Sequence, residues 1–499
     1  MNRSIFAFRH LTRCRNAVRI SPLRPLTTAS NRSDASPKTR NPGQQSFFGP
    51  KRLQCRSYST MVSYHSTVEA QRKYFKTGAT IPLEGRKAVL KKIKEITIKH
   101  GNDIADAVHK DLKRDREYTK AFDVAAVIGE CDYFLANLDE WAKPIPVSTA
   151  GSPVDPDAEA FIVKDPQGVV LLISPWNYPV FLCFWPLVPI IAAGNTCIIK
   201  PSELAPACSE LITKMVKENF DPNLITVVEG GVPETTALLE ERYDHIMYTG
   251  APHVAKIIMA AAAKNLTPVT LELGGKSPVI VEPDADIQKT AERLVANKWV
   301  NVGQTCITPD YVLTRDELKP KLAAAIEAEL TKKYGDKPKD SPLYSRIINE
   351  RHFDRLVSTL EKSEGKVLHK HGDDHHDRDD KFIAPHVLDV HDKDAFMQDE
   401  IFGPFLPLLS VNSFDEAIDF INNGEKPLAS YIFTKDEGKI AKFLSHTTAG
   451  GVTINDVQKH ASVKGLPFGG VGNSGMGRYN GKYGFDTFTH EKAVYKRPL

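Results

Sequence analysis

The feature that most constrains the fold is an alternation of short apolar runs with amphipathic stretches, which begins at Gly168. The pattern predicts strands over 168–173, 196–199, 224–228, 245–248 and 268–273, with helices over 202–219, 233–241 and 251–263. Strands that alternate with helices are typical of a parallel sheet with crossover helices on both faces. We therefore expect an open, doubly wound α/β unit that binds its ligand beyond the carboxyl ends of the strands.

A second alternating series starts near Ser277. It predicts a strand over 278–281, a helix over 286–300, a strand over 310–314 and a helix over 316–333. Before both series, residues 84–112 show a helical pattern that contains no obvious chemistry. The sequence therefore predicts two α/β domains with a cleft at their join, near Leu273 to Gly275.

An uncharged stretch from 166 to 199 is long enough to suggest a membrane-spanning helix. Its interior contains the prolines Pro175, Pro179, Pro186 and Pro189 and the asparagines Asn177 and Asn195. Because proline removes a helical hydrogen bond and clashes with the preceding turn, we expect these residues to break any single helix. We interpret the stretch as buried structure rather than as an integral membrane segment.

The net charge of +3 conceals two regions of opposite sign. Residues 1–60 hold 12 of the 65 basic residues but only one of the 62 acidic residues, Asp34, which leaves 53 basic and 61 acidic residues in 61–499. An acidic body lacks the basic face that nucleic-acid binding needs, so we expect no nucleic acid as a partner.

The basic leader, residues 1–60, is rich in Arg, Ser and Thr and poor in acids, which is typical of a mitochondrial transit peptide. A disordered basic tail that targets nothing is the alternative. Initiation at Met61 would give a leaderless cytoplasmic form. The five cysteines after the leader show no CxxC spacing, which suits a reducing compartment and indicates no disulfide framework.

Four Gly-rich or Pro-rich turns carry polar or reactive side chains at positions where loops are expected. They are Ser174 to Pro179, Leu271 to Lys276, Gly303 to Cys306 and Glu400 to Pro404. In this order and at these separations the turns resemble those of the aldehyde dehydrogenase superfamily, and the resemblance spans essentially all of 65–499. Lys200 to Glu203 is a further match. Thr249 to Gly250, Leu266 to Pro278 and Leu466 to Gly477 make the chain most similar to the class 3 or fatty-aldehyde branch.

The reactive side chain in these turns is the thiol of Cys306. A thiolate is the best protein nucleophile for an aldehyde carbon near neutral pH. The resemblance implies that the Asn177 amide and the Cys306 N–H stabilise the resulting oxyanion. It also implies that Glu272 activates the water that hydrolyses a thioester on Cys306. Glu400 is the alternative base, because the resemblance places it at the same site.

The resemblance implies NAD as the cofactor, with NADP as a second choice. Lys200 and Glu203 match the pair that faces the adenosine ribose, where a carboxylate accepts hydrogen bonds from free hydroxyls and repels a 2′-phosphate. Thr249 and Gly250 match the pyrophosphate site at a helix N-terminus, although the Ala-Pro that follows replaces the usual Ser-Thr. The other expected cofactor contacts are Ser174, Trp176, Leu273, Glu400, Phe402 and Phe468.

We expect no metal site. The segment from His371 to Asp380 mixes imidazoles and carboxylates, which invites a metal interpretation. Its acids alternate without apolar positions, however, and such a composition favours a solvated loop.

Overall, the resemblance implies NAD(P)-dependent oxidation of medium- to long-chain aliphatic or aromatic aldehydes to carboxylic acids. It implies a dinucleotide-binding domain over 61–150 and 168–272, a catalytic domain over 273–479, and a small β element for homodimerisation over 151–167 and 480–499.

Two alternatives belong to other functional classes. A cysteine-based acyltransferase or hydrolase would need a His base near Cys306 and no nucleotide site. A non-catalytic binding protein on the same fold would be expected to lose Cys306 or Glu272, and both residues are present.

Overall fold

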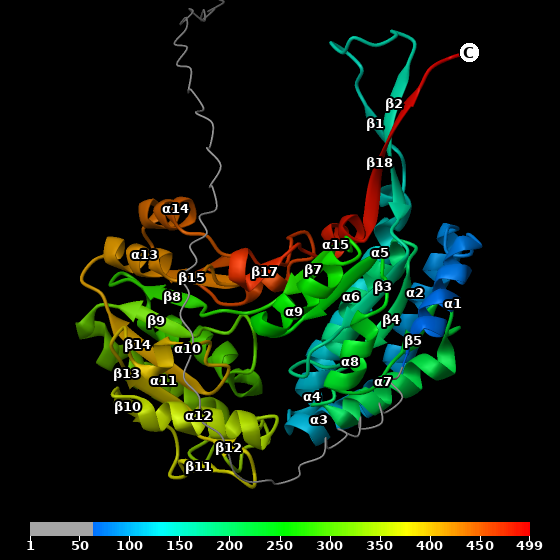
Figure 1. Ribbon diagram of the computed structural model, residues 1–499. Helices are drawn as coiled ribbons and strands as arrows, with labels where there is room; N and C mark the ends of the chain where they lie inside the picture. The colour runs from blue at the N-terminus through cyan, green and yellow to red at the C-terminus, as the bar shows by residue number, and fades with distance from the viewer. Residues whose placement is uncertain (1–62) are drawn as a thin grey trace, which may run out of the picture. The chain divides into compact units, whose positions relative to one another are not determined.

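The computed structural model describes residues 63–499, so the predicted leader lies outside the described residues. The described chain begins with a series of helices (Figure 1). They are α1 (His65–Lys76), α2 (Leu83–Lys99), α3 (Gly101–Leu112), α4 (Arg116–Thr119), a π-helical turn (Lys120–Val124) and α5 (Ala125–Trp141). The helical pattern predicted over 84–112 is confirmed, because its apolar residues Ile93, Ile104 and Val108 are fully buried on one face of α2 or α3.

Five parallel strands form most of a six-stranded sheet. They are β3 (Val169–Ile173), β4 (Thr196–Lys200), β5 (Ile225–Val227), β6 (His245–Thr249) and β7 (Val269–Glu272), each within one residue of its predicted range. Their spatial order, β7-β6-β3-β4-β5, is that of a doubly wound sheet in which the chain winds outward on both sides of β3. Every residue of β3, β4 and β6 is buried, as expected for parallel strands covered on both faces.

The helices that connect these strands are α6 (Phe181–Ala192), α7 (Pro206–Asn219), α8 (Val232–Leu239) and α9 (Pro252–Ala263). The sixth strand, β17 (Gly475–Met476), comes from far along the chain and runs antiparallel to β7, with Gly475 opposite Glu272. The predicted parallel sheet therefore gains one antiparallel strand at this edge. A segment from the range predicted for the catalytic domain completes the first sheet.

Helix α6 corrects one expectation about proline. It continues through Pro186 and Pro189, which we expected to interrupt any helix. All of its 12 residues are buried, so tertiary packing outweighs the lost backbone hydrogen bonds. The prediction of buried structure in this stretch is confirmed. Across residues 63–499, no helix combines the length and the apolar character that crossing a membrane requires.

The second sheet has seven strands in the order β10-β13-β14-β9-β8-β15-β16. The six parallel strands are β8 (Pro278–Val281), β9 (Tyr311–Thr314), β13 (His386–Asp389), β14 (Phe405–Ser410), β15 (Ala429–Phe433) and β16 (Gly451–Ile454), and β10 (Lys366–Lys370) is an antiparallel edge. Its helices are α10 (Ile287–Lys298), α11 (Lys319–Tyr334), α12 (Glu350–Lys362), α13 (Phe414–Asn423) and α14 (Glu437–His446). A short hairpin, β11 (His376–Asp377) and β12 (Phe382–Ile383), lies between β10 and β13 in the chain. The second alternating series is thus a second α/β unit.

The third sheet is a three-stranded antiparallel ribbon of β1 (Ile145–Val147), β2 (Glu159–Pro166) and β18 (Thr489–Lys496). Strand β18 pairs with β2 over its whole length, from Thr489 opposite Pro166 to Lys496 opposite Glu159. Figure 1 shows this ribbon extending away from the two larger sheets. The predicted β segment after 480 begins with a helix, α15 (Gly481–Thr487), and only then becomes a strand.

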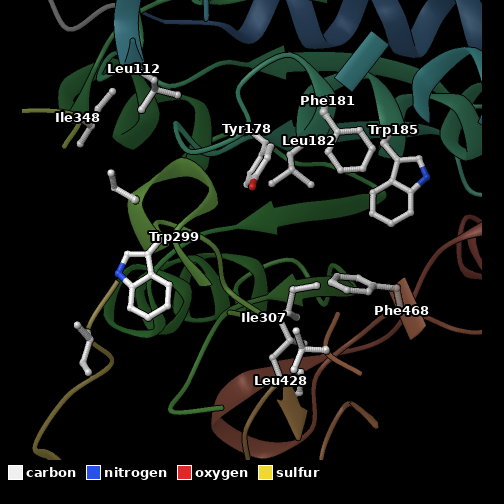
Figure 2. Packing of buried hydrophobic residues seen from close by; sticks show 14 of the residues in the cluster. Leu112, Tyr178, Phe181, Leu182, Trp185, Trp299, Ile307, Ile348, Leu428 and Phe468 are labelled. Atoms are coloured by element: carbon white, nitrogen blue, oxygen red, sulfur yellow. The ribbon is translucent and has the colours of Figure 1, made fainter. Parts of the chain in front are cut away.

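One hydrophobic cluster includes residues of both larger sheets. Figure 2 shows Tyr178, Phe181 and Trp185 side by side within it, with Ile307 and Phe468 across from them. The ring centroids of Phe181 and Trp185 are 4.8 Å apart, and those of Trp185 and Phe468 are 5.7 Å apart. Aromatic packing of this kind connects helix α6 with the segment that precedes β17.

Candidate active site

A cleft of about 940 Å³ lies where the join between the two α/β units was predicted. Leu273, Gly274 and Gly275 form part of its wall. From the first sheet it receives Trp176, Asn177, Thr249 and Gly250, and from the second unit Cys306, Glu400 and Phe402. The cleft thus brings together eight of the predicted site residues, at the carboxyl ends of β6 and β7.

Cys306 is held in the cleft by a tightly constrained loop. Asn301 and Val302 have φ values of 52° and 47°, a strained left-handed conformation for residues with a Cβ. Gly303 follows with φ 77°, and a Cβ there would lie 2.2 Å from the carbonyl oxygen of Gly403. Glycine is therefore required at 303, because this loop must touch the loop that carries Glu400.

The surroundings of Cys306 oppose ionisation of its thiol. Burial, with smaller contributions from Glu400 and Glu272, raises the pKa of Cys306 to about 12. The side chain therefore rests as a thiol, and its activation needs a proton acceptor or a nearby positive charge. The two carboxyl groups that raise its pKa are themselves the candidate acceptors.

Asn177 lies directly opposite the Cys306 loop. Its side-chain Nδ2 donates a hydrogen bond to the Gln304 carbonyl oxygen at 3.1 Å. Its own carbonyl oxygen accepts from Asn301 Nδ2 at 2.9 Å and from Arg114 Nη1 at 3.2 Å. The structure therefore brings together the two predicted oxyanion donors, and one amide hydrogen of Asn177 is left over for a ligand.

Glu272 is the last residue of β7 and is only 1% exposed. Neither of its carboxyl oxygens has a hydrogen-bond partner among residues 63–499. Burial raises the pKa of Glu272 well above its usual range. It does not line the cleft itself, yet its carboxyl contributes to the raised pKa of Cys306. An unpaired buried carboxyl beside a thiol is the arrangement expected of a proton acceptor.

Glu400 lies in the loop before β14 and lines the cleft. Burial, followed by the charge of Asp310, raises the pKa of Glu400 to about 8. A Cβ at Gly274 would lie 2.3 Å from a Glu400 carboxyl oxygen, so the absence of a side chain at 274 makes room for this carboxyl. Glu400, in a loop, and Glu272, at the end of β7, thus both have pKa values that burial raises above the usual range of a glutamate.

An ion pair that the sequence analysis did not find fixes the Glu400 loop. Lys276 Nζ lies 2.5 Å from Asp310 Oδ2 and donates to the carbonyl oxygens of Phe396 and Asp399 at 2.7 and 3.0 Å. Asp310 Oδ1 accepts from the Ile401 N–H at 3.0 Å. The two bonds from Lys276 to Phe396 and Asp399 join residues more than 100 positions apart. Local sequence patterns therefore give no signal for them.

The predicted adenosine pair is present as an ion pair. Lys200, at the end of β4, places Nζ 2.8 Å from Glu203 Oε2, and the Glu203 side chain is 43% exposed. The Ser174 backbone N–H donates to the Lys200 carbonyl oxygen at 3.1 Å. Lys200, Glu203 and Ser174 lie outside the lining of the 940 Å³ cleft, so the structure does not place all predicted cofactor residues in one cavity.

Thr249 and Gly250 lead from β6 into the N-terminus of α9. Ala251 occupies the cap position of this helix without a side-chain hydrogen bond, and Pro252 is its first residue. In the part of the chain that the structure describes, the hydroxyls of Thr249 and Ser174 have no hydrogen-bond partner. The N-terminus of α9 lines the cleft, and it suits a phosphate-bearing group.

The predicted aromatic contacts separate into two groups. Trp176 and Phe402 both line the cleft, with ring centroids 5.4 Å apart and nearly perpendicular planes. Phe468 does not line it and packs against Trp185 and Tyr479 instead. Leu273 is held by its N–H, which donates to the Ser474 carbonyl oxygen at 3.1 Å.

Sequence reasoning missed five basic residues that line the cleft: His253, Lys256, His352, Arg355 and Lys426. His253 and Lys256 lie in the first turns of α9, beside the helix N-terminus. Arg355 Nη2 donates to the Ile401 carbonyl oxygen at 2.8 Å, and His352 contacts the Trp176 ring. The three-residue spacing of His352 and Arg355 on α12 was a visible signal, but nothing local connects α12 with the cleft. Within 63–499 no group of three or more His, Cys, Asp and Glu side chains is suited to a metal.

Comparisons with known proteins agree with this architecture. The sequence model of the aldehyde dehydrogenase family matches residues 51–494. Aldehyde dehydrogenase family 3 member H1 of Arabidopsis thaliana is 44% identical over 430 residues, which are 86% of this chain and 88% of that protein. The dimeric NADP-preferring aldehyde dehydrogenase of Mus musculus is 43% identical over 441 residues, or 88% of this chain and 96% of that protein.

Solved structures show the same fold. The substrate-bound state of Staphylococcus aureus AldH superposes with a TM-score of 0.84 at 40% sequence identity, covering 88% of this chain and 95% of that one. The predicted α/β fold, with a doubly wound sheet and a second α/β unit, is therefore confirmed.

Proposed function

The chain belongs to the aldehyde dehydrogenase family, and from that premise we propose that it oxidises medium- to long-chain aliphatic or aromatic aldehydes to carboxylic acids with NAD or NADP. The observation that carries the proposal is the meeting of Cys306, Asn177 and Glu400 in one cleft, with the unpaired carboxyl of Glu272 behind them. A thiol, an amide donor and two carboxyls with raised pKa values are the groups that aldehyde oxidation through a thioester requires.

In the first step, the Cys306 sulfur bonds to the aldehyde carbon, and the thiol proton passes to a neighbouring carboxylate. The carbonyl oxygen becomes an oxyanion, which accepts hydrogen bonds from the free amide hydrogen of Asn177 and from the Cys306 N–H. Because Asn177 Nδ2 is already held by the Gln304 carbonyl at 3.1 Å, this donor needs little reorganisation.

Bound NAD(P) supplies the hydride acceptor. The residues that would hold it are Thr249, Gly250 and the N-terminus of α9 at the pyrophosphate, and Lys200 and Glu203 at the adenosine ribose. With the cofactor bound, the tetrahedral carbon held on Cys306 would lose its hydride, and the acyl group would remain on the Cys306 sulfur as a thioester.

Hydrolysis of this thioester regenerates the enzyme. Glu272 removes a proton from water, the hydroxide adds to the acyl carbon, and the carbon–sulfur bond breaks to release the acid and the thiol. Glu400 is the alternative base, because it lines the cleft and its pKa is about 8. We rank Glu272 first, since neither of its oxygens has another bonding role in the described residues.

The Glu203 carboxylate supports a preference for NAD, because it would repel the 2′-phosphate of NADP. The neighbouring Lys200 ammonium at 2.8 Å offsets part of this repulsion. The mouse relative is named NADP-preferring, so NADP remains in the proposal as a second cofactor. The ratio of kcat/KM values for the two cofactors tests the order.

The rings of Trp176 and Phe402, which line the cleft with centroids 5.4 Å apart, support apolar aldehydes as substrates. Each additional methylene buried against such a surface contributes about 0.8 kcal/mol. A series of kcat/KM values against aldehyde chain length, from propanal to dodecanal, would show the expected rise and its limit.

We also propose a homodimer formed through the β1-β2-β18 ribbon. Strand β18 is an unprotected edge, and Tyr495, Ile145 and Val147 are exposed on the ribbon. The mouse relative is named dimeric. Light scattering on the full chain and on a variant that ends before Thr489 should show a dimer and a smaller species respectively.

Mitochondrial import through residues 1–60 remains a proposal that rests on the composition of the leader. Imaging of a full-length fusion and of a fusion that starts at Met61 tests it. We expect mitochondrial and cytoplasmic signals respectively, and a diffuse signal from the full-length fusion would contradict targeting.

The experiment that tests the function is the increase in NADH absorbance when decanal or benzaldehyde is added to the enzyme with NAD. We expect NADH with the native chain and none with Cys306→Ala. Absence of NADH formation with every aldehyde and both cofactors would overturn the proposal and favour the cysteine hydrolase or binding-protein alternatives.

A further inference from the structure

A buried ion pair connects the N-terminal helices with the turn that carries Asn177. Arg114, between α3 and α4, donates through Nη2 to Asp123, which lies in the π-helical turn Lys120–Val124. Both side chains are almost completely shielded from solvent, at 2% and 0% exposure. The other Asp123 oxygen has no partner in the described chain, so the guanidinium is the contact that orients this carboxylate. This segment adjoins the helices in which the sequence showed no chemistry.

The same guanidinium contacts Asn177 and Tyr178, two consecutive residues of the turn from Ser174 to Pro179. Its Nη1 donates to the Asn177 carbonyl oxygen at 3.2 Å, and its Cζ lies 4.5 Å from the centre of the Tyr178 ring. The Tyr178 hydroxyl in turn is 3.1 Å from Thr305 Oγ1, immediately before Cys306. Arg114 is thus linked to both sides of the predicted oxyanion site.

From these contacts we propose that Arg114 and Asp123 are positioning residues, which hold the Asn177 amide and the Cys306 loop in register for attack on the aldehyde. The proposal rests on the proposed function, because it assigns the pair to the step in which the oxyanion forms. Neither residue touches the substrate.

The arrangement at the Asn177 carbonyl explains why the pair affects the amide. That oxygen accepts one bond from Arg114 and a second from Asn301 Nδ2 at 2.9 Å, so the backbone is held from the helices and from the Cys306 loop at once. Without Arg114, only the contact with the Cys306 loop remains. A shift of about 1 Å in a catalytic donor is enough to slow a reaction about 100-fold.

A role in stability alone makes a different prediction. Buried ion pairs are often replaceable by apolar residues of similar shape without loss of stability, whereas removal of one partner strands a buried charge. The double variant Arg114→Met/Asp123→Leu removes both charges and keeps the approximate shape of both side chains. If the pair only fills and stabilises the interior, this variant should fold and react like the native enzyme.

The test is the rate of the first NADH burst in stopped flow with saturating NAD and decanal. We expect the double variant to slow the burst by about 10- to 100-fold, with a dissociation constant for NAD that changes less than about two-fold. The matched control is Arg86→Met. Arg86 is another buried arginine, which donates to the backbone carbonyls of Thr80 and Ala192 and does not line the cleft. Its burst rate should stay near the native value.

A second variant tests the link to Cys306 without disturbing the ion pair. Tyr178→Phe removes only the hydroxyl that faces Thr305, and it should slow the burst several-fold while thermal unfolding stays unchanged. If the double variant does not fold, this variant decides the question alone.

The outcomes separate the positioning role from the proposed function. If the double variant folds and shows the native burst rate, the positioning role is overturned. If the double variant does not fold, a native burst rate in Tyr178→Phe overturns it. Absence of any burst in the native enzyme would overturn the proposed function instead. A slower burst accompanied by an equal loss in Arg86→Met would also overturn positioning, because the defect would then follow general destabilisation.

Discussion

The substitution Glu272→Gln tests the proposed division between acylation and hydrolysis. Glu272 is buried, and neither of its oxygens has a hydrogen-bond partner in residues 63–499. Glutamine has nearly the same shape but cannot accept a proton from water. The thiol of Cys306, the amide of Asn177 and the cofactor residues stay in place, so formation of the thioester should continue.

The expected magnitude follows from the chemistry that is removed. A positioned general base contributes about 100- to 10,000-fold, so steady-state turnover should fall by that factor, which corresponds to about 3–5 kcal/mol in the barrier for hydrolysis. Stability should not fall, because a neutral amide replaces a buried carboxyl whose pKa burial has raised well above its usual range. The melting temperature of the variant should therefore equal or exceed that of the native enzyme.

Stopped-flow absorbance distinguishes the two phases in a single trace. We expect a burst of about one NADH per active site in Glu272→Gln, followed by a very slow steady state. Glu400→Gln serves as the comparison at the alternative base. Native steady-state turnover in Glu272→Gln, or loss of turnover only in Glu400→Gln, would refute the assignment of the base.

Three further predictions follow from individual residues. Replacing Glu203 with Ser should shift the ratio of kcat/KM values for the two cofactors toward NADP by about 10-fold or more, because it removes a negative charge where the 2′-phosphate would lie. An unchanged ratio would contradict the assignment of Glu203 to the adenosine ribose. Gly303→Ala should destabilise the protein by about 1–3 kcal/mol in urea unfolding, because φ is 77° and a Cβ would meet the Gly403 carbonyl, whereas Gly335→Ala, with φ 71° and open space around it, should cost less. Burial raises the pKa of Glu400 to about 8, so this group favours the folded state at low pH and loses that contribution as the pH rises through 8. The melting temperature of Glu400→Gln, relative to that of the native enzyme, should therefore increase between pH 6 and pH 9. A constant difference between the two melting temperatures would contradict the raised pKa.

Local patterns predicted the elements that local forces determine. Strands β3, β4, β6 and β7 were visible because each is a short apolar run bounded by turn residues, and each is completely or largely buried in the structure. Cys306 and Asn177 were found because each lies in a Gly-rich or Pro-rich turn that the family resemblance makes recognisable.

Contacts between distant segments account for what sequence reasoning missed. The Arg114–Asn177 bond joins residues 63 positions apart, and the Lys276–Asp310 pair holds a loop that begins more than 100 residues later. Helix α6 tolerates Pro186 and Pro189 because the helices α2, α5 and α15 and the first sheet pack around it, which no window of local sequence reveals. The two-residue strand β17 was too short to predict, although it pairs with Glu272 itself.

The central claim is that the acyl group is carried on Cys306. Its most direct test is mass analysis of Glu272→Gln quenched in acid shortly after mixing with NAD and decanal. We predict a gain of one decanoyl group on the peptide that contains Cys306, and no gain when NAD is omitted. Release of NADH without an acyl adduct on that peptide, or an adduct on Cys131, Cys183, Cys197 or Cys208 instead, would contradict the account.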